Sequence, residues 1–68
     1  MNKTETVKRV QRKLKELGYY SGEIDGKIND LMARAIIRYK RATGIFPNNM
    51  LVDMALLNML HLEINEKE

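Results

Sequence analysis

The sequence predicts a small all-α domain, a bundle of three helices. Apolar residues recur at helical spacing in three segments, a glycine follows each of the first two segments, and the chain has only 68 residues without cysteine. A chain of this length buries only about 60% of its unfolded surface, so its helices must share one compact core. Without cysteine, that core has no disulfide bonds and no thiolate ligands for zinc. We therefore expect one domain over residues 1–60 and a frayed polar tail over residues 61–68.

The first helix is expected to begin after Asn2, which with Glu5 has the spacing of a capping box. We expect Gly18 to end it and Gln11, beside the apolar stripe, to bond a backbone group. The stripe itself, which we place in the core, consists of Val7, Val10, Leu14 and Leu17.

Residues 19–26 combine turn-forming residues with aromatic and aliphatic anchors, which indicates an ordered loop. We expect Tyr19 and Ile24 to anchor this loop, with Tyr19 rather than Tyr20 as the buried tyrosine of the pair. Asp25–Gly26 has the composition of its tightest turn.

The second helix is expected to be capped by Asn29 or Asp30 and stopped by Gly44. Its apolar positions follow the i, i+3, i+4, i+7 pattern: Met32, Ala35, Ile36 and Tyr39. A short third helix follows, which begins at Asn49 or Asp53 and ends near Leu60.

The segments before the second and third helices share a pattern, which indicates a degenerate internal half-repeat. Residues 25–30 and 48–53 both read as a turn pair, a spacer, an aliphatic residue, another spacer and an aspartate, directly before a helix. In both copies the turn pair reverses the chain and the aspartate is placed to cap the helix.

Residues 10–26, VQRKLKELGYYSGEIDG, resemble the three-helix peptidoglycan-binding domain that is attached to bacterial and phage cell-wall hydrolases. That family reads roughly V-x-x-L-Q-x-x-L-x-x-L-G-Y-Y-x-G-x-I-D-G, then F-G-P-x-T-x-x-A-V-x-x-F-Q, and then a weaker second copy ending in T-W-x-x-L. The resemblance continues without gaps to about residue 60. It implies a fold like that of the family and the binding of bacterial cell-wall glycan or stem peptide without catalysis.

The resemblance keeps the family's core positions and loses its turn signature. The Ala, Val, Phe and Gln positions are held by Ala35, Ile36, Tyr39 and Lys40. Departures from the pattern are Ile28 for Phe, Asn29–Asp30 for Gly-Pro, Met32 for Thr, Asn48–Asn49 for Asp-Gly and Ala55–Leu56 for Thr-Trp. The resemblance therefore supports the fold more strongly than the ligand.

The chain does not have the residues of a hydrolase. Its one serine, Ser21, and one histidine, His61, cannot make a catalytic triad. Glu23 and Asp25, with Asp30 after them, lack the ligand loop of a calcium site, so turn and capping roles are favoured. We expect no enzymatic activity, no metal and no cofactor.

A ligand surface is expected on the 19–25 loop and the start of the second helix. An aromatic face can pack on a sugar, and an arginine can bind a carboxylate with two parallel hydrogen bonds. The candidate ligand-binding residues are Tyr20, Ser21, Glu23, Asn29, Arg34 and Arg38. The alternative is structural: Tyr20 covers the core and both arginines are merely solvated.

A second interpretation makes this a cytosolic interaction protein, from a phage or mobile element, that reuses the fold. From Met50 to Leu60 the third helix is apolar on nearly every side, and a three-helix domain covers only one side of a helix. Met50, Met54 and Leu57 are therefore candidate contacts to a partner protein or to a second copy of the chain.

Charge is distributed unevenly along a chain of net charge +3. Residues 1–46 carry 11 basic and 5 acidic side chains, whereas residues 47–68 carry one basic and four acidic ones. Basic residues line the first helix at Lys8, Arg12 and Lys15 and the second at Arg34, Arg38 and Arg41, but without the interleaved aromatics of single-strand binders. We do not expect binding to nucleic acid or to a membrane.

No secretory signal is recognisable at the start of the chain, because charged residues follow at once. An intact gene product of this sequence is expected in the cytoplasm. Excision from a larger exported protein, or another delivery route, would place it in the cell wall.

Overall fold

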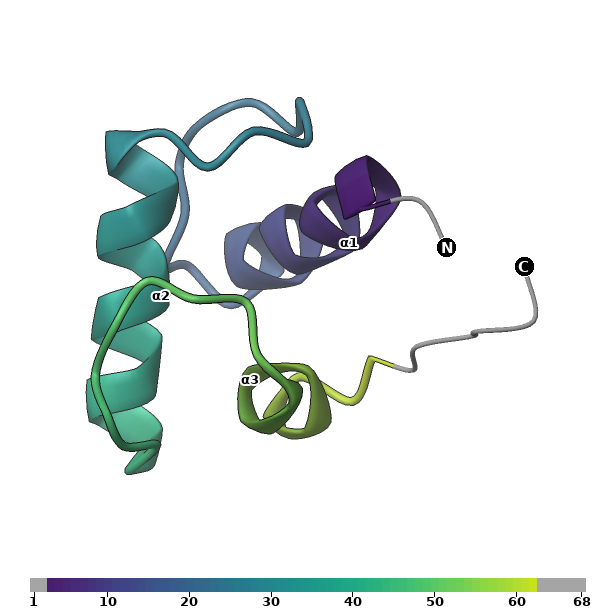
Figure 1. The fold of residues 1–68 in the computed structure, drawn as a ribbon. Helices are drawn as coiled ribbons and strands as arrows, with labels where there is room; N and C mark the ends of the chain where they lie inside the picture. The colour runs from purple at the N-terminus through teal and green to yellow at the C-terminus, as the bar shows by residue number, and fades with distance from the viewer. Residues whose placement is uncertain (1–2, 63–68) are drawn as a thin grey trace, which may run out of the picture.

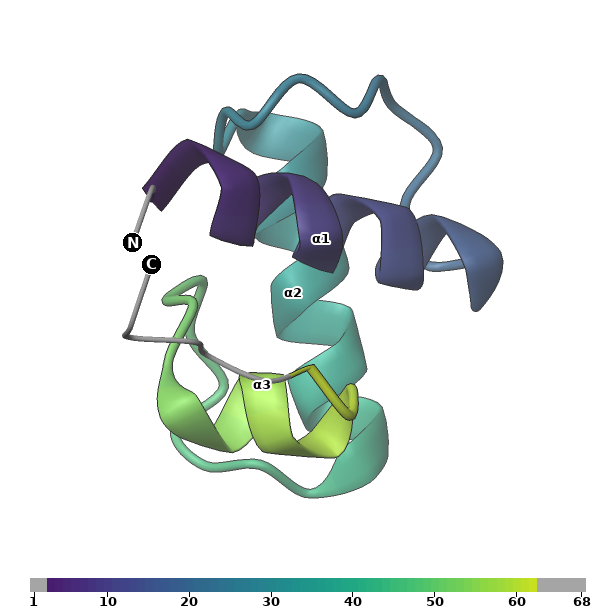
Figure 2. The ribbon, with the colours of Figure 1, turned by 90° about the vertical axis from the view of Figure 1, so that its right-hand side faces the viewer.

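A computed structural model describes residues 3–62 of the chain. It contains three helices: α1 over Lys3–Glu16, α2 over Asp30–Thr43 and α3 over Met54–Met59. In Figures 1 and 2, α1 and α3 lie on the same side of α2, one beyond the other along it, and both cross it steeply. Residues 3–62 contain no strand, so the predicted all-α, three-helix fold is confirmed.

The core lies where α1 and α3 meet α2. The apolar stripes predicted for α1 and α2 supply most of it, and Leu56 and Leu57 of α3, with its C-cap Leu60, close it. The ring of Tyr19 meets that of Tyr39 edge-on, with 5.3 Å between centroids. No helix within the described residues is long and apolar enough to span a membrane.

Two core assignments were wrong. Leu17 is 49% exposed, because α1 ends at Glu16 and the chain turns through Gly18 at a φ of 88°, which takes Leu17 off the helical stripe. Tyr20, not Tyr19, is the buried tyrosine, with only 3% of its surface exposed.

Helix ends follow the predicted capping chemistry. The side chain of Asn29 accepts a hydrogen bond from the Met32 N–H, and that of Asp53 accepts one from the Leu56 N–H, both at 2.9 Å. Gly44 adopts the left-handed conformation that ends α2. The predicted cap of α1, Asn2, lies outside the described residues.

The loop before α2 is tied to α1 through the buried side chain of Gln11. Its Nε2 donates to Asp25 Oδ1 and to the Lys27 carbonyl, both at 2.9 Å, while its Oε1 accepts from the Gly26 N–H at 2.8 Å. Tyr20 lies against the same amide, 3.3 Å from Nε2. These residues, which we call the Gln11 cluster, confirm that Gln11 bonds the backbone.

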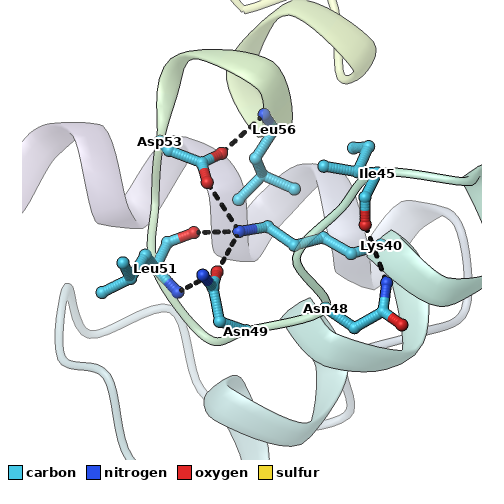
Figure 3. A network of polar contacts seen from close by, with 7 residues as sticks. All are labelled: Lys40, Ile45, Asn48, Asn49, Leu51, Asp53 and Leu56. Atoms are coloured by element: carbon cyan, nitrogen blue, oxygen red, sulfur yellow. Dashed lines mark hydrogen bonds and ion pairs between the residues drawn. The ribbon is translucent and has the colours of Figure 1, made fainter.

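The segment before α3 is tied to α2 through the fully buried side chain of Lys40 (Figure 3). Its Nζ donates to Asn49 Oδ1 at 2.6 Å, to the Leu51 carbonyl at 2.8 Å and to Asp53 Oδ2 at 2.8 Å. An ammonium group has three N–H bonds, so each has its own acceptor. We call these four residues the Lys40 cluster.

The two clusters define the internal half-repeat in three dimensions. The acceptors lie 14 and 16 residues after Gln11 and 9 and 11 residues after Lys40, because the second link is shorter. The predicted register was wrong by one residue: Asp25 corresponds to Asn49, not Asn48. The reason is that α2 is capped by Asn29, so Asn29 rather than Asp30 corresponds to Asp53.

The third helix is shorter than the apolar run that predicted it. Met50, Leu51 and Val52 precede its cap, and within the helix the apolar side chains divide into buried Leu56 and Leu57 and exposed Met54 and Met59. Of the two predicted starts, Asn49 and Asp53, the structure has Asp53. The expectation that the segment from Met50 is a helix apolar on nearly every side was wrong.

Packing extends past residue 60, where we placed the end of the domain. The Leu62 N–H donates to the Leu57 carbonyl at 2.9 Å, and its side chain packs partly against the core. The rest of the predicted tail, residues 63–68, lies outside the described residues.

Candidate functional site

The 20–23 loop keeps only part of its predicted ligand surface. Tyr20 donates its hydroxyl proton to the Glu23 carbonyl at 2.6 Å and turns its ring into the core, so its face is not open to a sugar. The structural alternative for Tyr20 is the correct one. Ser21 and Glu23 remain exposed, on a loop braced by Lys15, whose Nζ donates to the Gly22 carbonyl at 3.1 Å.

On α2, the predicted residues have two different roles. Asn29 uses its side-chain oxygen to cap the helix. Arg34 and Arg38 lie one turn apart on the exposed face, and neither forms an ion pair with any residue in the range 3–62. Their guanidinium groups are thus available to an anionic ligand.

The loop and the arginines are not joined by direct polar contacts. No hydrogen bond or ion pair within the described part of the chain joins Ser21 or Glu23 to Arg34 or Arg38. The ligand-binding role of this surface stays a prediction.

A groove of about 520 Å³ opens between the start of α1 and the segment before α3. It falls in the usual size range of small-molecule sites, about 300–1,000 Å³. Its lining is mostly aliphatic and comprises Lys3, Thr6, Val7, Ile28, Met50, Leu51, Val52, Asp53 and Leu57. We call it the α1–α3 groove.

The Lys40 cluster fixes one wall of this groove. Lys40 binds the carbonyl of Leu51 and the side chains of Asn49 and Asp53, so three points of the 49–53 segment are attached to one buried nitrogen (Figure 3). The Asn49 side chain also accepts from the Leu51 N–H at 3.2 Å, which closes the turn. Sequence reasoning missed this wall, although a lysine at the family's glutamine position was its signal.

Of the three residues predicted to contact a partner protein, two are exposed and one is buried. Met50 is half exposed and lines the groove, and Met54 is more than half exposed on α3. Leu57 was wrong as an exposed contact, because it is buried between the helices and only reaches the groove floor. It became a candidate because the third helix was expected to be apolar on nearly every side.

Two opposite charges border the groove, Lys3 and Asp53. Partial burial acts to raise the pKa of Asp53, but hydrogen bonds from Lys40 and from the Leu56 N–H, together with the lysine charge, outweigh it and lower the pKa. Asp53 is therefore a carboxylate at neutral pH. The described residues hold no group of three or more His, Cys, Asp or Glu side chains that could bind a metal ion.

Comparisons with known proteins agree with the resemblance read from the sequence. A family model described as a peptidoglycan binding domain matches residues 3–48, which is more than half of the chain. A search of curated proteins gave no match, and neither did a search of solved structures. The match covers α1, the Gln11 cluster and α2. It ends at residue 48, before the groove wall formed by residues 50–53. The chain belongs to the peptidoglycan-binding domain family.

Proposed function

We propose that the protein is a non-catalytic module that binds bacterial peptidoglycan and acts at the cell wall, where it recognises glycan or stem peptide. The family match over residues 3–48 carries this proposal. The composition supports the absence of catalysis: Ser21 is the one serine and His61 the one histidine, which leaves few candidates for a nucleophile and its base.

Two surfaces are available for the polymer. The α1–α3 groove offers aliphatic side chains with one cation and one carboxylate, and the outer face of α2 offers Arg34 and Arg38. The groove supports specific recognition, because it is concave and its carboxylate, on Asp53, is held by Lys40 and the Leu56 N–H. The arginines support longer-range attraction to the carboxylates of the wall, which salt weakens.

Co-sedimentation with purified sacculi tests the proposal, at low and high salt. An Arg34→Glu/Arg38→Glu variant measures the contribution of α2, and Lys8→Glu/Arg12→Glu on α1 is the matched control, with the same spacing and charge change. We expect wild-type protein to pellet at both salt concentrations. Pelleting that disappears at high salt, or falls equally in both variants, would reduce the interaction to attraction between net charges and contradict the proposal.

A second candidate function is a cytosolic interaction module that dimerises or binds a partner protein. The observation in its favour is the exposure of Met50, Leu51, Met54 and Met59, all apolar and close in sequence. Light scattering at increasing concentration tests the homodimer form, with Met54→Glu as the variant because Met54 is exposed. A constant mass of 7.9 kDa with no effect of the variant would refute dimerisation.

A further inference from the structure

We infer that the α1–α3 groove binds the stem peptide of peptidoglycan rather than its glycan strand. The inference rests on the proposed function and makes its site specific. It concerns a surface whose wall lies largely beyond the part of the chain that matches the family.

The shape and lining of the groove suit a short peptide. Val7, Val52 and Leu57 form apolar surface inside it, while Ile28 and Leu51 present half-exposed aliphatic side chains at its edges. Such surfaces gain free energy by covering small apolar groups such as alanine methyls, at about 25 cal/mol per Å² removed from water. Stem peptides are rich in alanine.

The same lining suits a sugar poorly. Pyranose rings present their C–H faces to aromatic side chains and need hydrogen-bond partners for many hydroxyl groups. None of the residues that line the groove is aromatic, and its polar groups are few. A glycan in this groove would bury hydroxyl groups without partners, which costs free energy.

The charges at the border match those of a stem peptide. Its terminal carboxylate is complementary to the ammonium group of Lys3, which has no ion-pair partner among residues 3–62. The free amino group of its diamino acid is complementary to Asp53, whose carboxylate is still 37% exposed after binding Lys40. Opposite charges on the two partners give a short peptide one favoured direction in the groove.

The wall of the groove is preorganised for this task. Because Lys40 holds residues 49, 51 and 53 by side-chain or carbonyl contacts, the side chains of Met50, Leu51 and Val52 project from an already ordered segment. Binding to an ordered wall avoids the entropic cost of ordering it.

The test is an NMR titration of the full chain with the synthetic pentapeptide L-Ala-D-isoGln-L-Lys-D-Ala-D-Ala. We expect shift changes at Val7, Ile28, Met50 and Leu51, and a Leu51→Glu variant that binds at least tenfold more weakly. Leu31→Glu is the matched control, because Leu31 is 51% and Leu51 59% exposed and Leu31 lies outside the groove. Urea unfolding of both variants checks that they are folded. Shift changes confined to the α2 arginines, or equal affinity of both variants, would overturn the inference.

A peptide with a C-terminal amide isolates the contact to Lys3. We expect amidation to weaken binding to wild-type protein about three- to tenfold, and not to weaken it in a Lys3→Glu variant, where the peptide carboxylate meets a like charge that amidation removes. Arg41→Glu, with the same charge change on α2, should keep the full response to amidation. Equal responses in Lys3→Glu and wild type would remove Lys3 from the site.

The outcomes separate this inference from the proposed function. If wild-type protein pellets with sacculi but the pentapeptide neither binds nor competes, wall binding stands and the peptide assignment fails. If the pentapeptide binds in the groove while sacculi are not pelleted, the assignment stands and the wider proposal fails. If Leu51→Glu pellets as wild type does, the groove is not the wall-binding site.

Discussion

The Gln11 and Lys40 clusters perform the same structural task with different chemistry. In each, one buried side chain from a helix binds a side-chain oxygen in the next loop, Asp25 or Asn49, and a carbonyl two residues further on. In each, that oxygen also accepts the N–H two residues ahead, and a cap follows four residues after it. The first cluster is centred on a neutral amide and the second on a cation.

The difference shows what a charge requires in a small core. The amide of Gln11 both donates and accepts, so it also satisfies the Gly26 N–H and needs no counter-ion of its own. An ammonium group only donates, and a buried cation is costly without an anion. Asp53 supplies that anion and also caps α3. The start of α3 is therefore stabilised by a residue that is itself bound to the Lys40 cation of α2.

The largest effect is expected from Lys40→Met, which keeps the apolar stem and removes the cation. Asn49, the Leu51 carbonyl and Asp53 would lose their shared donor, and removing one member of a buried pair costs about 3–5 kcal/mol. A domain of this size has about 3–10 kcal/mol in total. Urea unfolding followed by circular dichroism measures the loss, and a change below about 1 kcal/mol would mean that the cluster contributes little.

Lys40→Gln makes the comparison of the two clusters more direct, because it places a glutamine at the centre of both. Glutamine is shorter than lysine by one atom and has no charge for Asp53, so we expect an intermediate loss of about 2 kcal/mol. Full stability would show that the cation is interchangeable with an amide at this position.

Gln11→Leu should cost somewhat less than Lys40→Met, about 2–3 kcal/mol, because the one charged group that loses a donor, the Asp25 carboxylate, is exposed to water. The Gly26 N–H and the Lys27 carbonyl lose their partner, but both are only partly buried and can be reached by water. Urea unfolding gives the value, and a larger loss than that of Lys40→Met would contradict the ranking of the two clusters.

Gly26→Ala tests a feature that the second loop does not share. Gly26 has a φ of 78° and lies against Thr4 of α1, so an added Cβ meets both backbone strain and a close contact. We expect a loss of about 2 kcal/mol in urea unfolding. The equivalent residue in the second loop is Met50, which does not have a positive φ, so Met50→Gly should cost less than 1 kcal/mol.

The helices and caps of this fold could be predicted because they depend on neighbouring residues. The spacing of Met32, Ala35 and Ile36 predicted α2. Asn29 and Asp53, which cap α2 and α3, were each one of two residues predicted for that role. The groove could not be predicted, because it depends on Lys40 turning inward to residues that follow it by 9–13 positions. A lysine on a helix is normally predicted to lie on the surface. Lys40 is buried because its ammonium group reaches acceptors that are distant in sequence.

The smallest effects on the free energy of unfolding are expected from removing the charge of Asp53 or Asp25 alone. The pH dependence of unfolding distinguishes the contribution of this charge from those of hydrogen bonding and packing. The pKa of Asp53 is lowered in the folded protein despite the opposing effect of its partial burial, because Lys40 and the Leu56 N–H favour the carboxylate. Its contribution is therefore fully present above the unfolded pKa of about 3.9 and is lost as the pH falls through the folded value. Asp53→Asn keeps a capping side chain and removes the charge. The asparagine oxygen can still accept from Lys40, and the carboxylate that it replaces is 37% exposed and solvent-screened. We therefore expect the substitution to cost about 1 kcal/mol at pH 7, and less as the pH falls through the folded pKa of Asp53.

Asp25→Asn is the matched change in the Gln11 cluster. The pKa of Asp25 is lowered chiefly by the hydrogen bond from Gln11, then by that from the Lys27 N–H, so the sign of its pH dependence is the same. Asp25 is exposed and its main partner is neutral, so an asparagine carbonyl can accept the same two bonds. As the pH falls from 7 to 2, the urea midpoint of Asp53→Asn should therefore approach that of wild type, whereas the midpoint of Asp25→Asn should differ little from wild type at either pH. Equal responses of the two variants would mean that the cation of Lys40 gives Asp53 no stabilisation beyond that of a neutral donor.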